Sequence, residues 1–127
     1  QVNASGESGY NEVMTTTQFQ TWNGEGGGDT GLGYNSGQNN GTAFEIISGS
    51  GGNGSDENMA FTLHLFNPSS TTYVKHYYIT SPGYNINSES QNFYCGGYIN
   101  TTAAIDEVQF KMTTGVFDGK IKMWGVK

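Results

Sequence analysis

The chain contains no arginine, a single cysteine, two prolines and no long hydrophobic run. Proteins that bind nucleic acids neutralise phosphates with arginine and lysine, so the lack of arginine and a formal net charge of −6 argue against that class. Cys95 has no second cysteine to pair with, which excludes an internal disulfide and predicts a buried, unreactive thiol. No segment approaches the ~18 apolar residues of a membrane-spanning helix, which argues against insertion into a membrane.

Helix-forming residues are scarce as well, because alanine, leucine, glutamate and lysine never gather into a run long enough for a helix. The abundant residues are 20 glycines together with asparagine, serine and threonine, and the aromatic residues are eight tyrosines, seven phenylalanines and two tryptophans. Such a composition is typical of short strands joined by many turns. We therefore expect one all-β domain over residues 1–127, a length sufficient for a real core.

Alternation of apolar and polar residues predicts the strands. Residues 59–66 read MAFTLHLF, in which Thr62 and His64 alternate with apolar side chains. We expect seven strands, at residues 10–22, 43–47, 59–66, 71–80, 91–100, 104–112 and 120–126. The residues expected to face the core are Phe61, Leu63, Leu65, Val108, Phe110, Met112, Ile121 and Met123. Seven strands at regular spacing without a helical period indicate an antiparallel β-sandwich or jelly roll.

Two glycine-rich segments separate these strands. Residues 23–42 predict either one long loop or two turns around a short piece near residues 32–34, and residues 48–58 predict a second flexible loop. Because ordering glycine costs the most backbone entropy, we expect both segments to be the least protected from hydrogen exchange. Their acids, Glu25 with Asp29 and Asp56 with Glu57, offer oxygen ligands for Ca²⁺, although solvated turns are the favoured interpretation.

Three motifs carry a resemblance to a known family. They are FNPSSTTYVKHYYIT (residues 66–80), GYINTTAAIDEVQFKMTTG (97–115) and DGKIKMWGVK (118–127). They resemble a bacteriophage virion domain in which an NPS-TTYVKH hairpin precedes an INTTSAI segment and a closing GTIKLYGIK strand. The resemblance begins at residue 66 and covers about half of the chain.

The resemblance implies a concanavalin-like jelly roll at the C-terminus of a longer virion protein. It further implies a non-enzymatic structural protein without a cofactor, displayed on the particle as a tail-fibre or receptor-binding module or as a capsid-surface module. The alternatives are a capsid decoration protein and a secreted carbohydrate-binding module, with a hydrolase last. The partners expected from it are other virion proteins and a host-surface glycan.

The sequence departs from this family at its beginning. The family has further strands before the point at which this chain starts, and residues 23–42 have no clear counterpart. A sandwich without these further strands is open and exposes sheet edges, which natural proteins cover or pair. Residues 1–74 also carry seven acids and no lysine, whereas residues 75–127 carry four acids and five lysines. We therefore expect homo-oligomers or docking on a larger virion protein.

No arrangement of residues predicts catalysis or a metal site. His64 and His76 lack the spacing of metal ligands, and nothing in the sequence places either beside Cys95 for nucleophilic catalysis. The aromatic residues are more numerous than one core face requires, and exposed rings stack on sugars or anchor subunit contacts. The residues expected to bind are Trp124, Tyr77, Tyr73, Tyr84 and Trp22.

Overall fold

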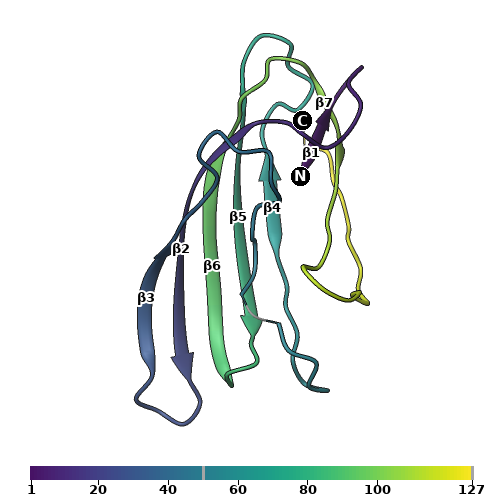
Figure 1. The fold of residues 1–127 in the computed structure, drawn as a ribbon. Coiled ribbons are helices and arrows are strands. Elements are labelled where there is room, and N and C mark those ends of the chain that lie inside the picture. Colours follow the sequence, from purple (N-terminus) through teal and green to yellow (C-terminus); the bar gives the residue numbers. More distant parts are fainter. Residues whose placement is uncertain (50, 127) are drawn as a thin grey trace.

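The computed structural model describes residues 1–49 and 51–126, so Ser50 of the second glycine-rich segment and Lys127 of the closing motif lie outside the described residues. Within these ranges the chain is all-β and contains no helix, and thus no helix long and apolar enough to cross a bilayer. A five-stranded antiparallel sheet packs against a two-stranded antiparallel sheet, as the sequence predicts for a β-sandwich (Figure 1). The prediction of an antiparallel sandwich is confirmed.

The larger sheet has the strand order β3–β2–β6–β5–β4. Its strands are β2 (Met14–Gly24), β3 (Thr30–Asn35), β4 (Thr62–Leu65), β5 (Lys75–Tyr84) and β6 (Glu89–Ile99). The smaller sheet pairs β1 (Val2–Ala4) with β7 (Ile105–Val108). The long central strands β2 and β6 pair over their whole length, from Met14 opposite Ile99 to Gly24 opposite Glu89.

A tight turn joins β5 to β6 and fixes their register. The side-chain oxygen of Asn85 accepts hydrogen bonds from the backbone N–H of Asn87 (3.0 Å) and of Glu89 (3.1 Å). The Asn85 amide in turn donates to the Glu89 carboxylate (2.7 Å), and Ser88 takes the left-handed conformation with φ of 57°. Asparagine favours such turns because its side chain bonds to its own backbone two residues on.

The core lies between the two sheets, at one end of the larger one (Figure 1). The β1–β7 sheet covers this end, and Ile99 at the end of β6 is 1% exposed. The buried apolar cluster consists of Val2, Ala4, Met14, Tyr77, Ile79, Cys95, Ile99 and Ile105. Phe61, Leu63, Leu65 and Val108 pack against it half-buried, as their alternation predicts.

Lys75 is the largest fully buried side chain of this region, at the start of β5. Its ammonium group donates hydrogen bonds to the backbone oxygens of Thr101 (3.2 Å) and Ala103, and thus fastens the segment between β6 and β7 to the sheet. A long side chain of this kind buries its apolar stem while its charged end finds polar partners. The charge of Lys75 is therefore satisfied by carbonyl dipoles.

Two predicted strands are wrong. Residues 43–47 cross the inner face of β2 through side-chain contacts: Thr16 donates to the Glu45 carboxylate (2.8 Å) and the Gln18 amide donates to the Ile46 carbonyl. Because these contacts are made by side chains of β2, the segment forms no backbone hydrogen-bond ladder with this strand. Residues 120–126 also form no strand, and Ile121 and Met123, predicted to face the core, are exposed, Met123 by 82%.

The remaining predicted strands differ mainly in their bounds. Residues 104–112 pair only at 105–108, after which Phe110 continues half-buried and its ring lies 5.2 Å from that of Phe61. Residues 23–42 contain β3, so the second alternative, two turns around a short piece, is correct. The turn before β3 requires glycine because Gly27 and Gly28 have φ of 73° and 86°, in the left-handed region.

Candidate binding site

The five aromatic residues expected to bind do not form one site. Tyr77 is 7% exposed and belongs to the core, so its prediction as a contact residue is wrong. Its hydroxyl lies 3.9 Å from the sulfur of Met14, and burial raises the pKa of Tyr77. Tyr73 and Trp124 are exposed by 72% and 76%, on two separate segments outside the sheets.

Trp22 is fixed against β3 on the inner face of the larger sheet. A Cβ atom on Gly31 would lie 2.2 Å from the Trp22 ring, so the indole lies directly over the glycine backbone. The indole N–H also donates to the Asp29 carboxylate in the following turn (3.1 Å). The glycines of β3 therefore leave the room that the Trp22 ring occupies.

Tyr84 lines an open cleft of about 450 Å³ at the end of β5, within the usual size range of small-ligand sites. The cleft is built from the ends of β2, β5 and β6 and from the segment before β4. Its lining residues are Asn23, Gly24, Glu25, Asn58, Ala60, Pro82, Gly83, Tyr84 and Ser90. The tyrosine hydroxyl donates to the Glu25 carboxylate across the cleft (3.3 Å).

Backbone hydrogen bonds tie the walls of this cleft together. The N–H of Tyr84 donates to the Asn58 carbonyl (2.9 Å), and the N–H of Ala60 donates to the Pro82 carbonyl (2.9 Å). On the opposite wall, the N–H of Glu25 donates to the Ser88 carbonyl (3.1 Å). The cleft is thus preformed by contacts between three distant parts of the sequence.

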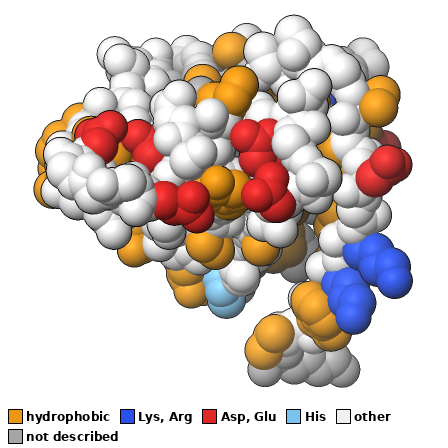
Figure 2. All heavy atoms as spheres, turned by 90° about the horizontal axis from the view of Figure 1, so that it is seen from below, with side chains coloured by type: hydrophobic (Ala, Val, Ile, Leu, Met, Phe, Trp, Pro, Cys, Tyr) orange, Lys and Arg blue, Asp and Glu red, His pale blue; other side chains and the backbone are white. Residues whose placement is uncertain are grey.

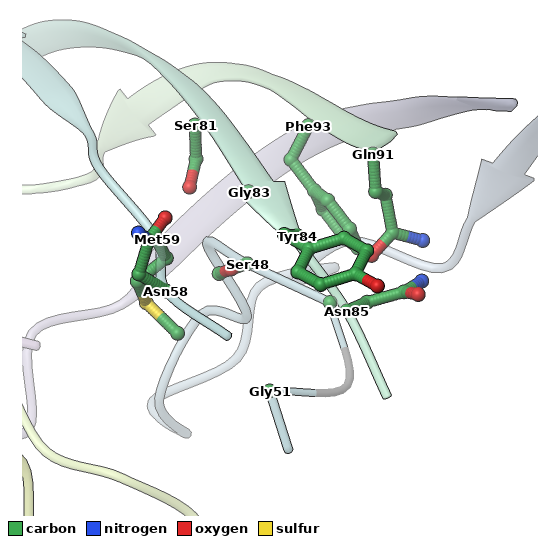
Figure 3. A pocket seen from close by; sticks show the side chains of 11 residues that line it. Ser48, Gly51, Asn58, Met59, Ser81, Gly83, Tyr84, Asn85, Gln91 and Phe93 are labelled. Carbon is green, nitrogen blue, oxygen red and sulfur yellow. The ribbon is translucent and has the colours of Figure 1, made fainter. Parts of the chain in front are cut away.

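A much smaller cavity adjoins the cleft on the inner side of β5 (Figure 3). Its volume of about 10 Å³ is the room of a single water molecule. Figure 3 shows Met59 and Asn58 on one side of it and Phe93, Gln91 and Tyr84 on the other. This cavity is too small for a ligand, whereas the open cleft has room for one.

The cleft lies at the acidic end of the molecule. Seen from that end, acidic side chains gather around exposed hydrophobic atoms, and the basic side chains in view lie on a separate projection (Figure 2). The chain brings its two acidic glycine-rich segments together here, since Glu25 and Asn58 line the same cleft. No group of three or more histidine, cysteine, aspartate and glutamate side chains that could hold a metal ion forms among residues 1–49 and 51–126.

The sheet separates the residues that nucleophilic catalysis would require. Cys95 lies in the core on the inner face of β6, where burial and the nearby Glu45 carboxylate raise the pKa of its thiol to about 12. His64 and His76 lie on the outer face, where His64 stacks on Tyr78 with ring centroids 4.5 Å apart. A sheet thus stands between the thiol and both imidazoles.

Sequence reasoning identified only part of the cleft. Tyr84 was predicted as a binding residue and Glu25 as a possible ligand for Ca²⁺, but Asn23, Asn58 and Ser90 carried no signal of their own. They meet only because the ends of β2 and β5 and the start of β6 lie at one edge of the sheet.

Searches of protein-family models, curated proteins and solved structures found no match to this chain.

Proposed function

We propose that this chain is a non-enzymatic β-sandwich module of a bacteriophage virion, displayed on the particle as a tail-fibre or receptor-binding domain. We further propose that it binds a neutral saccharide of the host surface in the cleft beside Tyr84. The attribution to a virion rests on the motifs at residues 66–80, 97–115 and 118–127. The observation that carries the binding function is the preformed cleft, in which one aromatic ring faces several neutral hydrogen-bonding groups.

The lining groups suit a sugar. An aromatic ring such as that of Tyr84 packs against the apolar face of a pyranose, while a few polar groups fix its orientation. The amides of Asn23 and Asn58 both donate and accept, the Ser90 hydroxyl does the same, and the Glu25 carboxylate accepts from sugar hydroxyls. No lysine or arginine lines the cleft, so sialylated, uronic or phosphorylated glycans lack a cationic partner there.

The same lining supports binding without hydrolysis. Glycosidases use two carboxyl groups that flank the scissile bond at roughly 5–9.5 Å from each other. Glu25 is the one carboxylate among the residues that line the cleft. A bound saccharide would therefore meet a hydrogen-bond acceptor but no acid–base pair.

Calorimetry with neutral oligosaccharides, selected from a glycan array, tests the site. We expect Tyr84→Ala to weaken binding at least tenfold, because it removes both the ring and the partner of Glu25. Tyr73→Ala is the matched control, since Tyr73 is an exposed tyrosine outside the cleft. Equal losses in both variants, or binding confined to anionic glycans, would contradict the proposal.

Mass spectrometry of purified particles tests the location. We expect peptides of this chain in stoichiometric copies per virion, and immunogold labelling of the tail. Labelling of the capsid would instead favour a decoration protein. Recovery of the chain only as a free protein that binds sugar would favour a secreted carbohydrate-binding module.

A further inference from the structure

The outer face of the five-stranded sheet, which points away from β1 and β7, carries no formal charge. Its side chains are the outward residues of β2 to β6, which alternate with the buried ones, and none of them is Asp, Glu, Lys or Arg. The two charged residues that these strands carry elsewhere in their paired lengths, Lys75 and Glu89, are buried on the inner side. An uncharged face of this size is unusual on a protein with a formal net charge of −6.

Exposed aromatic and aliphatic side chains lie on this outer face among threonine, asparagine, serine and histidine side chains. Tyr34 is 83% exposed and Leu32 66% exposed on β3, and Tyr78 is 42% exposed on β5. Phe19 on β2 links Tyr34 to Tyr94 of β6, with centroids 6.5 and 4.7 Å away. Contiguous exposed apolar surface of this kind marks an interaction site in soluble proteins.

The geometry of the rings favours a protein partner over a sugar. Phe19 and Tyr94 stack with 13° between their planes, and His64 stacks on Tyr78 with the same angle. Because the broad faces of these rings are turned toward each other, each ring has one face closed to a sugar. A sugar needs an open ring face, whereas stacked rings pack against the side chains of another sheet.

The charge distribution favours a second copy of this chain. A partner with a charged surface would bury its charges against an uncharged face, which costs free energy without a compensating ion pair. A second copy presents the same uncharged face and keeps its acids outside the contact. Such an arrangement, in which the same patch serves both subunits, is the usual form of a two-fold dimer.

The area of the face is sufficient for a stable dimer. Five strands spaced at about 4.8 Å, with a mean length of roughly eight residues at 3.3 Å each, cover about 650 Å². Two such faces would bury about 1,300 Å², which lies in the range of specific protein–protein interfaces. The Tyr78 and Tyr34 side chains, on opposite halves of the face, supply the exposed aromatic anchors.

We infer that two copies of this chain pack through the outer faces of their five-stranded sheets into a two-fold dimer. The inference is argued without the saccharide cleft: the rings that carry it lie along the strands, whereas the cleft residues Asn23, Pro82, Tyr84 and Ser90 lie at one end of the same face. It also replaces the predicted anchor Tyr77, which is buried, by residues that the sheet presents outward.

Sedimentation equilibrium of the 127-residue chain tests the dimer. Thr17→Glu introduces a charge at the middle of β2, where Thr17 is exposed on the outer face opposite Gly96. Thr102→Glu makes the same chemical change at an exposed position outside the sheets. We expect Thr17→Glu to raise the dimer dissociation constant at least about 100-fold, since it would bury an unpaired charge in the interface, and Thr102→Glu to leave it unchanged.

Circular dichroism and a thermal melt show whether each variant is folded. If Thr17→Glu does not fold, Gly96→Glu replaces it, because a Cβ atom on Gly96 meets only Tyr77 O at 3.8 Å and Tyr78 Cβ at 4.0 Å. A wild-type chain that remains a monomer up to about 1 mM would overturn the inference. So would a dimer that a folded face variant leaves intact.

Discussion

Residues 59–66 and 120–126 show the same alternation in the sequence and opposite outcomes in the structure. In the first segment, Leu63 lies opposite Ile79 of β5 and packs against the core. In the second, Met123 is exposed and no residue between 120 and 126 belongs to a strand. The difference is the neighbour: β5 pairs with the first segment, and no strand of the described residues pairs with the second.

Alternation shows that a segment can form a strand with one apolar face, but it does not show that the segment forms one. A period of two makes one face of a segment apolar, but a strand is stabilised by cross-strand pairs and by burial of that face. The segment at 59–66 obtains both, because its strand β4 lies next to the β5–β6 hairpin in the sheet. Three tests separate the two environments, in order of expected effect.

The largest difference is expected between a core side chain and a side chain of similar size in the exposed segment at 120–126. Ile99→Ala removes a 1%-exposed side chain from the core and should lower the free energy of unfolding by about 2–5 kcal/mol. Met123→Ala, at an 82%-exposed position, should change it by less than about 0.5 kcal/mol. Urea titration of both variants measures this, and comparable losses would show that the segment at 120–126 is packed in solution.

A smaller difference is expected for the lysines. Lys75→Met keeps the buried stem but leaves the carbonyls of Thr101 and Ala103 without their donor, and should cost about 1–3 kcal/mol. Lys122→Met, on the exposed segment, should be neutral within about 0.5 kcal/mol. Hydrogen exchange of residues 100–104 should rise in the first variant alone, and unchanged exchange would show that another contact holds this segment.

The smallest effect on the free energy of unfolding at neutral pH is expected from the raised pKa of Cys95. Its pKa rises from 9.0 to about 12 on burial, so the folded state keeps a proton that the unfolded state loses. Stability from this group is therefore complete below pH 9 and decreases as the pH rises from 9 to 12. Iodoacetamide should label the thiol only in denaturant, and rapid labelling of the folded chain at pH 8 would contradict its burial.

The sequence predicted the fold class because strand composition and alternation report on local conformation. It could not predict β1, whose three residues have no pattern and pair only because Val2 lies opposite Val108, far along the chain. The phase of β5 was also ambiguous, since either phase of residues 75–80 contains a tyrosine. A lysine in a strand usually faces solvent, yet the hydrogen bonds of Lys75 to two carbonyls allow Lys75, Tyr77 and Ile79 to face inward.

The candidate site was predictable only as separate residues. Tyr84 and Glu25 are notable by type, but their 3.3 Å contact depends on the ends of β2 and β5 meeting at one edge. Asn58 joins them through its backbone carbonyl, which accepts from Tyr84, and such a bond has no sequence signature. Sites assembled from three loop ends therefore require the tertiary structure.

The placement of β6 between β5 and β2 sets an order for folding. The β5–β6 hairpin closes over a four-residue turn, so it can form as soon as both strands exist. The pairing of Met14 with Ile99 closes a loop of more than 80 residues, whose entropy must be lost before any contact compensates it. During synthesis, β2 leaves the ribosome more than 60 residues before its central partner β6. β3 can pair with one edge of β2 as soon as it is made, but the other edge stays open, and a chaperone or a rapid downstream hairpin would protect it from association with other nascent chains.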